Sequence, residues 1–176
     1  MRGKLADQEK ATIYQYQLIK KVFVRDELRR SHLSILAILS IFLMLMYRMD
    51  GLKALGIGIL SSLFIQFVIT RLTLIRVDEP DDRRWGWRLL APWFGYIPTA
   101  HIELGLYRRL HRHLLWLGLC AIGVFYPWAN EATMISLIMC HIWILAPRLV
   151  IMRKLRKMQK SGVLRIAGSE VSYYHR

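Results

Sequence analysis

Four blocks of the sequence contain no Asp, Glu, Lys or Arg, and the charged residues stand between them. The blocks span 33–47, 54–70, 114–129 and 132–147. Each is apolar around the whole circumference of a helix, a pattern typical of a membrane span or of the interior of a large protein. A chain of 176 residues is too small to bury four such helices away from water. The pattern therefore predicts an all-α integral membrane protein with four transmembrane helices.

The distribution of Lys and Arg predicts how these helices are oriented. Eight precede the first block, two follow it, eight lie between the second and third blocks, none lies in the loop around Asn130, and eight follow the last block. Cytoplasmic loops of membrane proteins carry an excess of Lys and Arg. We therefore expect a protein of the cytoplasmic membrane with both termini and the central segment in the cytoplasm. The net charge of +14 then requires no nucleic-acid partner.

Two pairs of similar stretches indicate an internal repeat. TRLTLIR at 70–76 and PRLVIMR at 147–153 each close an apolar block, and RRSH at 29–32 and RRLH at 108–111 open the corresponding units. We interpret them as two helical hairpins of the same orientation, a parallel repeat with a pseudo-two-fold axis along the membrane normal. Matches of this length also arise by chance in an arginine-rich membrane protein.

The predicted organisation has five segments. Apolar and aromatic residues at helical spacing predict a cytoplasmic amphipathic helix within 1–30, lying on the membrane surface. The others are a first transmembrane hairpin over 31–76, a cytoplasmic and interfacial connector over 77–112, a second transmembrane hairpin over 113–153 and a basic cytoplasmic tail over 154–176.

Local signals predict further structure around the second hairpin. Trp85, Trp87 and Trp93 favour a short interfacial helix, and Pro98 suits the first turn of another helix that runs into the third span. After the last block we expect the helix to continue to the Ser-Gly pair at 161–162. The alternating tail around Gly168 is compatible with a short C-terminal β-hairpin.

One cluster of residues has the chemistry of metal ligands: His101, Glu103, His111 and His113. On a helix His101 and His111 would lie about 15 Å apart along the axis, too far to share one ion. Zinc would need a further ligand from another segment, such as His32. We expect these side chains to face lipid headgroups, and we predict no metal and no cofactor.

The polar residues within the blocks favour helix packing over transport. The blocks carry no mid-membrane carboxylate, Lys or Arg, which are the usual mark of ion-coupled transport. Ala54, Gly58 and Ser62 form a ladder of small residues that allows a second helix to approach closely, either within the chain or from a partner. Gln66 and His141 are expected to tie helices together by hydrogen bonds, or to contact each other or a ligand across the pseudo-two-fold axis.

Arginine residues stand at the entry and exit of each predicted hairpin. They are Arg29, Arg30, Arg71, Arg76, Arg108, Arg109, Arg148 and Arg153. Guanidinium groups bind phosphates through two hydrogen bonds, and basic clusters at a membrane surface recognise anionic lipid headgroups. We therefore predict a basic cytoplasmic rim that binds anionic lipid or a cytoplasmic partner. The alternative is that these arginines serve membrane orientation alone.

Function follows from these features and from motifs that the sequence lacks. It contains no nucleotide-binding glycine loop, no pair of catalytic carboxylates and no nucleophile motif, so we do not expect an enzyme. We predict a scaffold or accessory subunit of a larger bacterial membrane assembly, in contact with other membrane subunits or with copies of itself. The alternative is a small oligomeric channel or transporter in which Ser62, Gln66 and His141 line a polar path.

Overall fold

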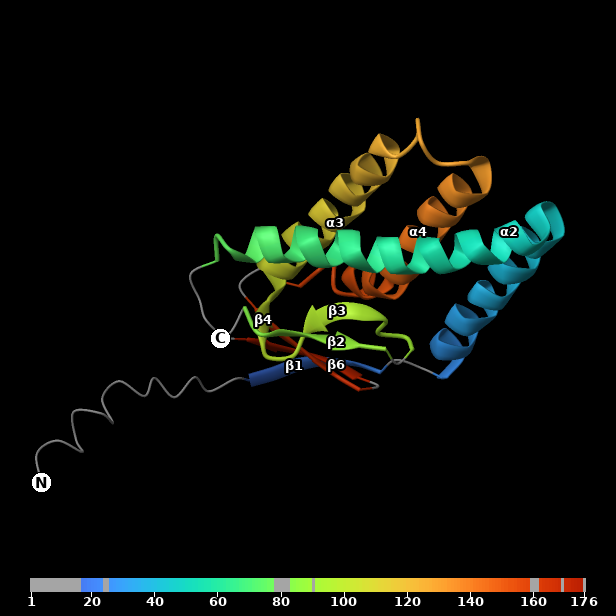
Figure 1. Ribbon diagram of the computed structural model, residues 1–176. Coiled ribbons are helices and arrows are strands. Elements are labelled where there is room, and N and C mark those ends of the chain that lie inside the picture. Colours follow the sequence, from blue (N-terminus) through green and yellow to red (C-terminus); the bar gives the residue numbers. More distant parts are fainter. Residues whose placement is uncertain are drawn as a thin grey trace, which may run out of the picture.

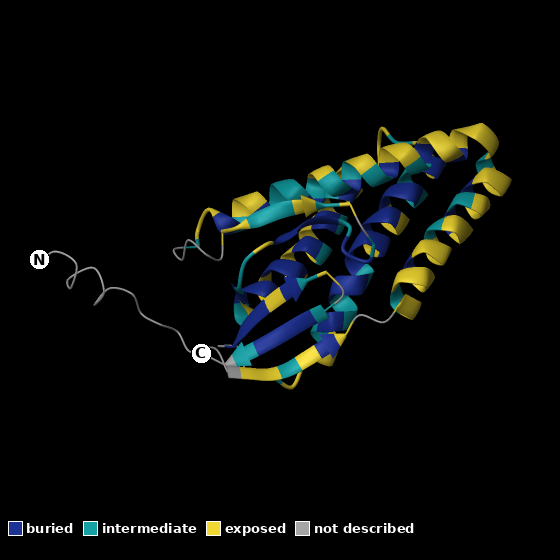
Figure 2. Cartoon of the chain, turned by 90° about the horizontal axis from the view of Figure 1, so that it is seen from below, coloured by how far each residue is buried: buried dark blue, intermediate teal, exposed yellow. Residues whose placement is uncertain are grey.

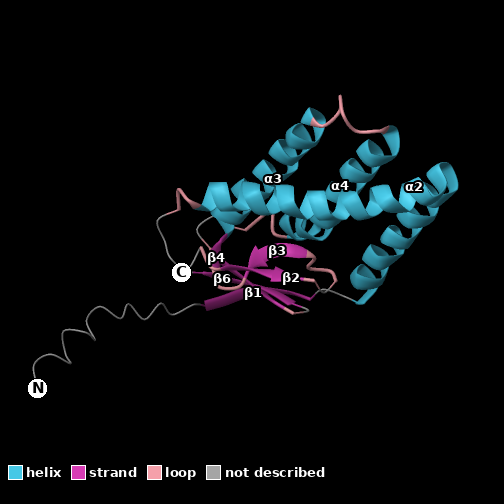
Figure 3. Ribbon diagram, viewed as in Figure 1, coloured by secondary structure: helices cyan, strands magenta, loops and turns pink. Residues whose placement is uncertain are grey.

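The computed structural model describes residues 17–23, 26–77, 83–89, 91–158, 162–168 and 170–175. The elements in these ranges are β1 (Gln17–Phe23), α2 (Asp26–Leu74), β2 (Trp85–Arg88), β3 (Gly95–Pro98), β4 (Ile102–Glu103), α3 (Leu104–Val124), α4 (Glu131–Lys154), β5 (Val163–Ala167) and β6 (Glu170–His175). The strands form two antiparallel sheets, which lie together below the helices in Figures 1 and 3. The predicted all-α fold of four transmembrane helices is therefore wrong.

Helix α2 consists of two arms that meet at a sharp bend. Arg48 has φ 53° and ψ −132°, which no helical residue adopts. The chain turns sharply there, and arms 26–47 and 49–74 diverge from the bend as the two sides of a V (Figure 1). A Cβ atom added to Gly51 would lie 2.1 Å from the carbonyl oxygen of Leu43. Only glycine therefore permits the two arms to approach this closely at the bend.

The second arm of α2 packs closely on α4. Ala54, Gly58 and Ser62 are all buried. A Cβ atom added to Gly58 would lie 2.3 Å from the Ser136 hydroxyl oxygen, so the α4 backbone passes close to this glycine. Ser62 also donates a hydrogen bond from its hydroxyl to the carbonyl oxygen of Leu137 at 3.3 Å. Small residues thus line the contact between the two helices.

The four-stranded sheet has the order β1-β6-β5-β4 and joins segments that are far apart in the sequence. Ile166 pairs with Val171 between β5 and β6, and Ile102 pairs with Leu164 between β4 and β5. These residues form one apolar core with side chains such as Tyr107 of α3. The sheet therefore packs against the beginning of α3 and the end of α4.

The amphipathic helix expected within 1–30 is not observed where the structure describes this segment. Residues 17–23 form strand β1, which pairs with β6, while 1–16 and 24–25 lie outside the described residues. Val22 is buried, whereas its neighbours Lys21 and Phe23 are exposed, as strand geometry requires. Backbone pairing with a distant strand has overridden the local helical spacing.

The expectation of helices in the connector is wrong for residues 85–98, whereas a helix, α3, does run from Leu104 into the third apolar block as expected. Trp85 and Trp87 belong to β2, which pairs with β3, and Pro98 ends β3 instead of beginning a helix. The hairpin is held to α2 by aromatic contacts, because the Phe67 ring lies 5.1 Å from Tyr96 and 5.5 Å from Trp87. Burial of aromatic surface against α2 favours the hairpin here.

The prediction for the chain end is correct in one part and wrong in the other. Strands β5 and β6 form the antiparallel hairpin that the alternating tail suggested, with Gly168 in the turn at φ +43°. Helix α4, however, ends at Lys154 and not at the Ser-Gly pair. Carbonyl groups just beyond this end accept hydrogen bonds from Arg108 of α3.

Helices α2 and α4 are long and apolar enough to cross a membrane. Of their most apolar stretches, 28% is buried in α2 and 56% in α4. Large apolar side chains are correspondingly exposed, including Leu45 at 78%, Leu60 at 71% and Trp128 at 80%. Figure 2 shows many exposed residues, in yellow, along the outer surfaces of the helices. Such an apolar surface requires a partner other than water.

Candidate functional site

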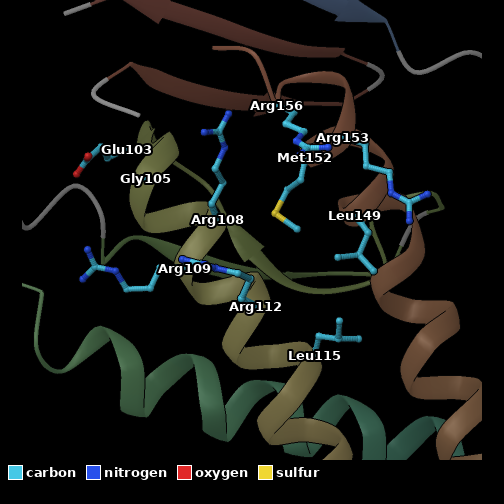
Figure 4. A pocket seen from close by; sticks show the side chains of 10 residues that line it. All are labelled: Glu103, Gly105, Arg108, Arg109, Arg112, Leu115, Leu149, Met152, Arg153 and Arg156. Atoms are coloured by element: carbon cyan, nitrogen blue, oxygen red, sulfur yellow. The ribbon is translucent and has the colours of Figure 1, made fainter. Parts of the chain in front are cut away.

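A pocket of about 580 Å³ lies between α3 and the end of α4 (Figure 4). We call it the arginine pocket because five arginines surround it. Its lining residues are Glu103, Gly105, Arg108, Arg109, Arg112, Leu115, Leu149, Met152, Arg153 and Arg156. Two helices therefore build the site, each contributing both arginine and apolar side chains.

Helical periodicity explains why these residues meet. On α3, Arg108, Arg112 and Leu115 follow one another at intervals of four and three residues, so they lie along one face. On α4 and the turn after it, Leu149, Met152 and Arg156 have the same kind of spacing. The two faces oppose each other across the pocket (Figure 4).

Arg108 fixes the width of the pocket at its sheet end. Its Nη2 atom donates hydrogen bonds to the carbonyl oxygens of Leu155 and Met158, at the end of α4. A cation in this position also interacts favourably with the negative end of the helix dipole. Arg108 thereby holds the end of α4 against α3, and its guanidinium group is partly occupied by protein ligands.

The other four arginines are exposed and available to a ligand. Within the described ranges, no ion pair or hydrogen bond engages the side chains of Arg109, Arg112, Arg153 and Arg156. Glu103 is the single acidic residue of the lining and lies at its edge (Figure 4). Five positive charges against one negative charge produce a strongly positive potential that attracts anions.

The pocket also has an apolar part. Leu115, Leu149 and Met152 lie between the two helices, while Arg109 and Arg153 extend outwards on opposite sides (Figure 4). Guanidinium groups beside an apolar surface suit a molecule that carries both a phosphate group and a hydrocarbon part. The arrangement is therefore suited to an anionic amphiphile.

The eight arginines of the predicted rim do not form one site. Arg108, Arg109 and Arg153 are brought together in the arginine pocket. Arg148, in contrast, is buried with 1% of its surface exposed, whereas its repeat counterpart Arg71 is exposed and lies over the ring of Phe67 at 6.0 Å. The two equivalent exit arginines thus have opposite environments.

The remaining rim arginines lie outside the pocket. Two arginines that line the pocket were not predicted from the sequence. Arg29 pairs with Asp26 at 3.7 Å, and Arg30 and Arg76 are exposed. Arg112 and Arg156 line the pocket but were not among the predicted site residues. The signal for Arg112 is its spacing of three and four residues from Arg109 and Arg108 on α3, and the signal for Arg156 is its spacing of three residues from Arg153, in the turn after α4.

Gln66 and His141 do not form the hydrogen bond to each other that the sequence suggested as one alternative. The Nε2 atom of His141 lies 3.1 Å from the carbonyl oxygen of Leu114 and so links α4 to α3. Gln66 is buried, and both polar atoms of its amide lack a hydrogen-bond partner among the described residues.

The possible metal ligands of the connector lie in different environments. The ring of His101 lies 5.9 Å from that of Tyr174, His111 is fully buried at 4.0 Å from the Tyr107 ring, and His113 is exposed. Among the residues described, no three His, Cys, Asp or Glu side chains converge as metal ligands do. Burial, together with the nearby charge of Arg148, lowers the pKa of His111 to about 3.

Comparisons of the chain with protein-family models, curated proteins and solved structures find no match. Two features of the molecule bear on its function. Helices α2 and α4 have the length and apolar character of membrane spans, and the arginine pocket combines exposed cations with apolar side chains.

Proposed function

We propose that the protein is a non-enzymatic membrane protein that binds anionic phospholipid headgroups at the cytoplasmic surface of a cell membrane. The observation that carries the proposal is the arginine pocket, in which four arginines without protein partners among the described residues adjoin an apolar floor. Clusters of arginine at headgroup depth recognise phosphate groups. Through this site the protein would act as a scaffold that gathers anionic lipid around a membrane assembly.

The exposed apolar surface supports insertion into a membrane. Leu45 and Leu60 on the two arms of α2 and Trp116 on α3 are each more than half exposed. Monomeric soluble proteins rarely carry extended apolar surfaces of this kind. A hydrocarbon environment would cover these side chains without requiring a protein partner for each of them.

The position of the pocket on α3 fits this arrangement. Arg108 lies near the beginning of the helix, and the exposed aromatic residues Phe125, Tyr126 and Trp128 follow its end. The rise of a helix places these two groups about 25 Å apart. This separation is close to the thickness of the hydrocarbon core, roughly 30 Å. The arginines and the aromatic turn therefore suit opposite membrane interfaces.

The proposal can be tested by native mass spectrometry of the detergent-solubilised protein with bound lipid. We expect phosphatidylglycerol to be retained in preference to phosphatidylcholine. The double variant Arg112→Gln with Arg156→Gln should weaken this retention by about tenfold or more, because each arginine contributes charge-assisted hydrogen bonds. The matched control is Arg71→Gln with Arg76→Gln, which removes the same charge from exposed positions outside the pocket.

A comparison of the two double variants decides the outcome. Loss of lipid only in the pocket variant supports a built site. Equal loss in both variants would mean that the arginines act through overall charge, and retention in both would refute the proposed function. Arg112→Lys with Arg156→Lys should bind less lipid than the wild type, since an ammonium group cannot form the two parallel hydrogen bonds of a guanidinium.

A further inference from the structure

Arg148 is a buried cation on α4 that does not belong to the arginine pocket. One percent of its surface is exposed. Its Nη2 atom donates a hydrogen bond to the carbonyl oxygen of Phe94 at 2.8 Å, in the segment before β3. Its Nε and Nη1 atoms have no hydrogen-bond partner among the described residues. Two of the three guanidinium nitrogens are therefore buried with unsatisfied protons.

Two side chains of α3 near Arg148 are also unsatisfied. Tyr107 is 1% exposed and His111 is fully buried, and both interact electrostatically with Arg148. The Tyr107 hydroxyl and the Nε2 atom of His111 have no hydrogen-bond partner within the described ranges. Buried polar atoms are nearly always hydrogen-bonded in native proteins. The Tyr107 hydroxyl and the Nε and Nη1 atoms of Arg148 are thus buried donors without acceptors among the described residues, as a bound anion would require.

The charges around Arg148 show what kind of species is required. The ionisable side chains that interact with it are Tyr107, His111 and, on its own helix, His141. Burial raises the pKa of Tyr107, so its hydroxyl stays protonated and acts as a donor. No carboxylate pairs with Arg148 among the residues described. A buried cation without a counter-charge is strongly destabilising, so an anion would compensate it.

We propose that Arg148 and Tyr107 bind a small inorganic anion of the halide class in the core between α3, α4 and β3. The Nε and Nη1 atoms of Arg148 and the Tyr107 hydroxyl are the donors. His111 does not donate to the anion, because its Nδ1 atom donates to the carbonyl oxygen of Tyr107 at 2.8 Å and leaves a lone pair on Nε2.

The burial of Arg148 favours a small anion, because only 1% of its surface is exposed. A Cβ atom added to Gly95 would lie 2.9 Å from Nη2 of Arg148 and 3.2 Å from Cδ2 of Leu63. The Nη2 end of the guanidinium group, which donates to Phe94, is therefore closed to a ligand, and an anion would bind at the Nε and Nη1 side. At this buried position a single halide needs less space than a sulfate or a lipid phosphate.

The test uses the full chain purified in detergent with gluconate in place of chloride. Chloride or bromide is added at constant ionic strength, and the unfolding temperature is measured. We expect both halides to raise the unfolding temperature of the wild type in a saturable manner. Arg148→Met should abolish the response, and Tyr107→Phe should weaken halide affinity about tenfold by removing one hydrogen bond to the anion. Arg71→Met, which removes the exposed repeat counterpart of Arg148, should retain the wild-type response.

The response to halide distinguishes an anion site at Arg148 from a general effect of salt. Equal unfolding temperatures in halide and gluconate, or an unchanged response in Arg148→Met, would overturn the proposal. A larger stabilisation by sulfate that depends on Arg148 would overturn the assignment to a small anion. If Arg148→Met does not fold, Tyr107→Phe decides, since it keeps the ring and the charge and loses only the hydroxyl. Halide affinity in Tyr107→Phe equal to that of the wild type would then refute the site.

Discussion

Arg108, near the beginning of α3, donates a hydrogen bond to the carbonyl oxygen of Leu155, the C-cap residue that follows α4. One side chain thus joins the two walls of the arginine pocket and satisfies backbone carbonyls that the end of a helix leaves without partners. The pocket is consequently part of the folded framework, and its shape depends on a residue that also lines it.

This contact predicts that Arg108 has a larger role in stability than its neighbour. Arg108→Gln should destabilise the protein by about 1–3 kcal/mol, because it removes charge-assisted hydrogen bonds to partly buried carbonyl groups. Arg109→Gln is the matched control, since Arg109 is exposed on the same helix and should change stability by less than about 0.5 kcal/mol. Thermal unfolding in detergent measures both. Equal effects would show that Arg108 is not the tie between the helices.

Gly58 and Gly56 offer a matched test of the packing of α2 on α4. Gly58→Ala should cost about 1–3 kcal/mol, because its Cβ atom would meet Ser136, with the hydroxyl oxygen at 2.3 Å and the carbonyl oxygen at 3.1 Å. Gly56→Ala should be neutral or stabilise by up to about 1 kcal/mol, since no atom lies within 4 Å and alanine favours a helix. Unfolding temperatures that do not differ between the two variants would contradict this interface.

Gln66→Leu distinguishes a scaffold from a channel. The amide is buried and has no hydrogen-bond partner among the described residues, so an apolar replacement should leave the unfolding temperature unchanged or raise it. Liposomes that contain the wild type or the variant should both retain a trapped fluorescent dye and an ion gradient. Ion flux through the wild type that is lost in Gln66→Leu would instead support a polar path through the helices.

Stability should fall on acidification because of His111. Burial lowers its folded-state pKa to about 3. Its unfolded-state pKa lies near 6.5, so below this pH the unfolded chain binds a proton that the folded protein does not. The free energy of unfolding should therefore decrease by about 2 kcal/mol for this group between pH 7 and pH 5. His111→Gln should have a shallower pH dependence of the unfolding temperature, whereas exposed His113→Gln should not. Parallel pH profiles for His111→Gln and the wild type would exclude His111 as the source.

Local sequence patterns were sufficient to predict those elements whose structure depends on residues close together in the sequence. The apolar blocks coincide largely with α2, α3 and α4, because an uncharged apolar stretch of this length favours a helix in any dry environment. The alternation on either side of Gly168 predicted the β5–β6 hairpin, whose two strands are consecutive in the sequence. The spacing of Ala54, Gly58 and Ser62 predicted one packing face, since it follows directly from helical periodicity.

Strand β1 and the environments of the arginines depend on partners that lie far away in the sequence. Residues 17–23 have helical spacing but form β1, because backbone hydrogen bonds to β6 at the other end of the chain stabilise the extended form. Arg71 and Arg148 occupy equivalent positions in two similar motifs, yet one is exposed and the other buried. Helix α4 packs against both α2 and α3, and Arg148 lies within that contact. The sequence by itself determined where the helices form and which side chains are cationic. Tertiary packing decided which of these cations remain at the surface. The reason is that the burial of a side chain depends on the neighbouring elements and not on the motif in which the residue stands.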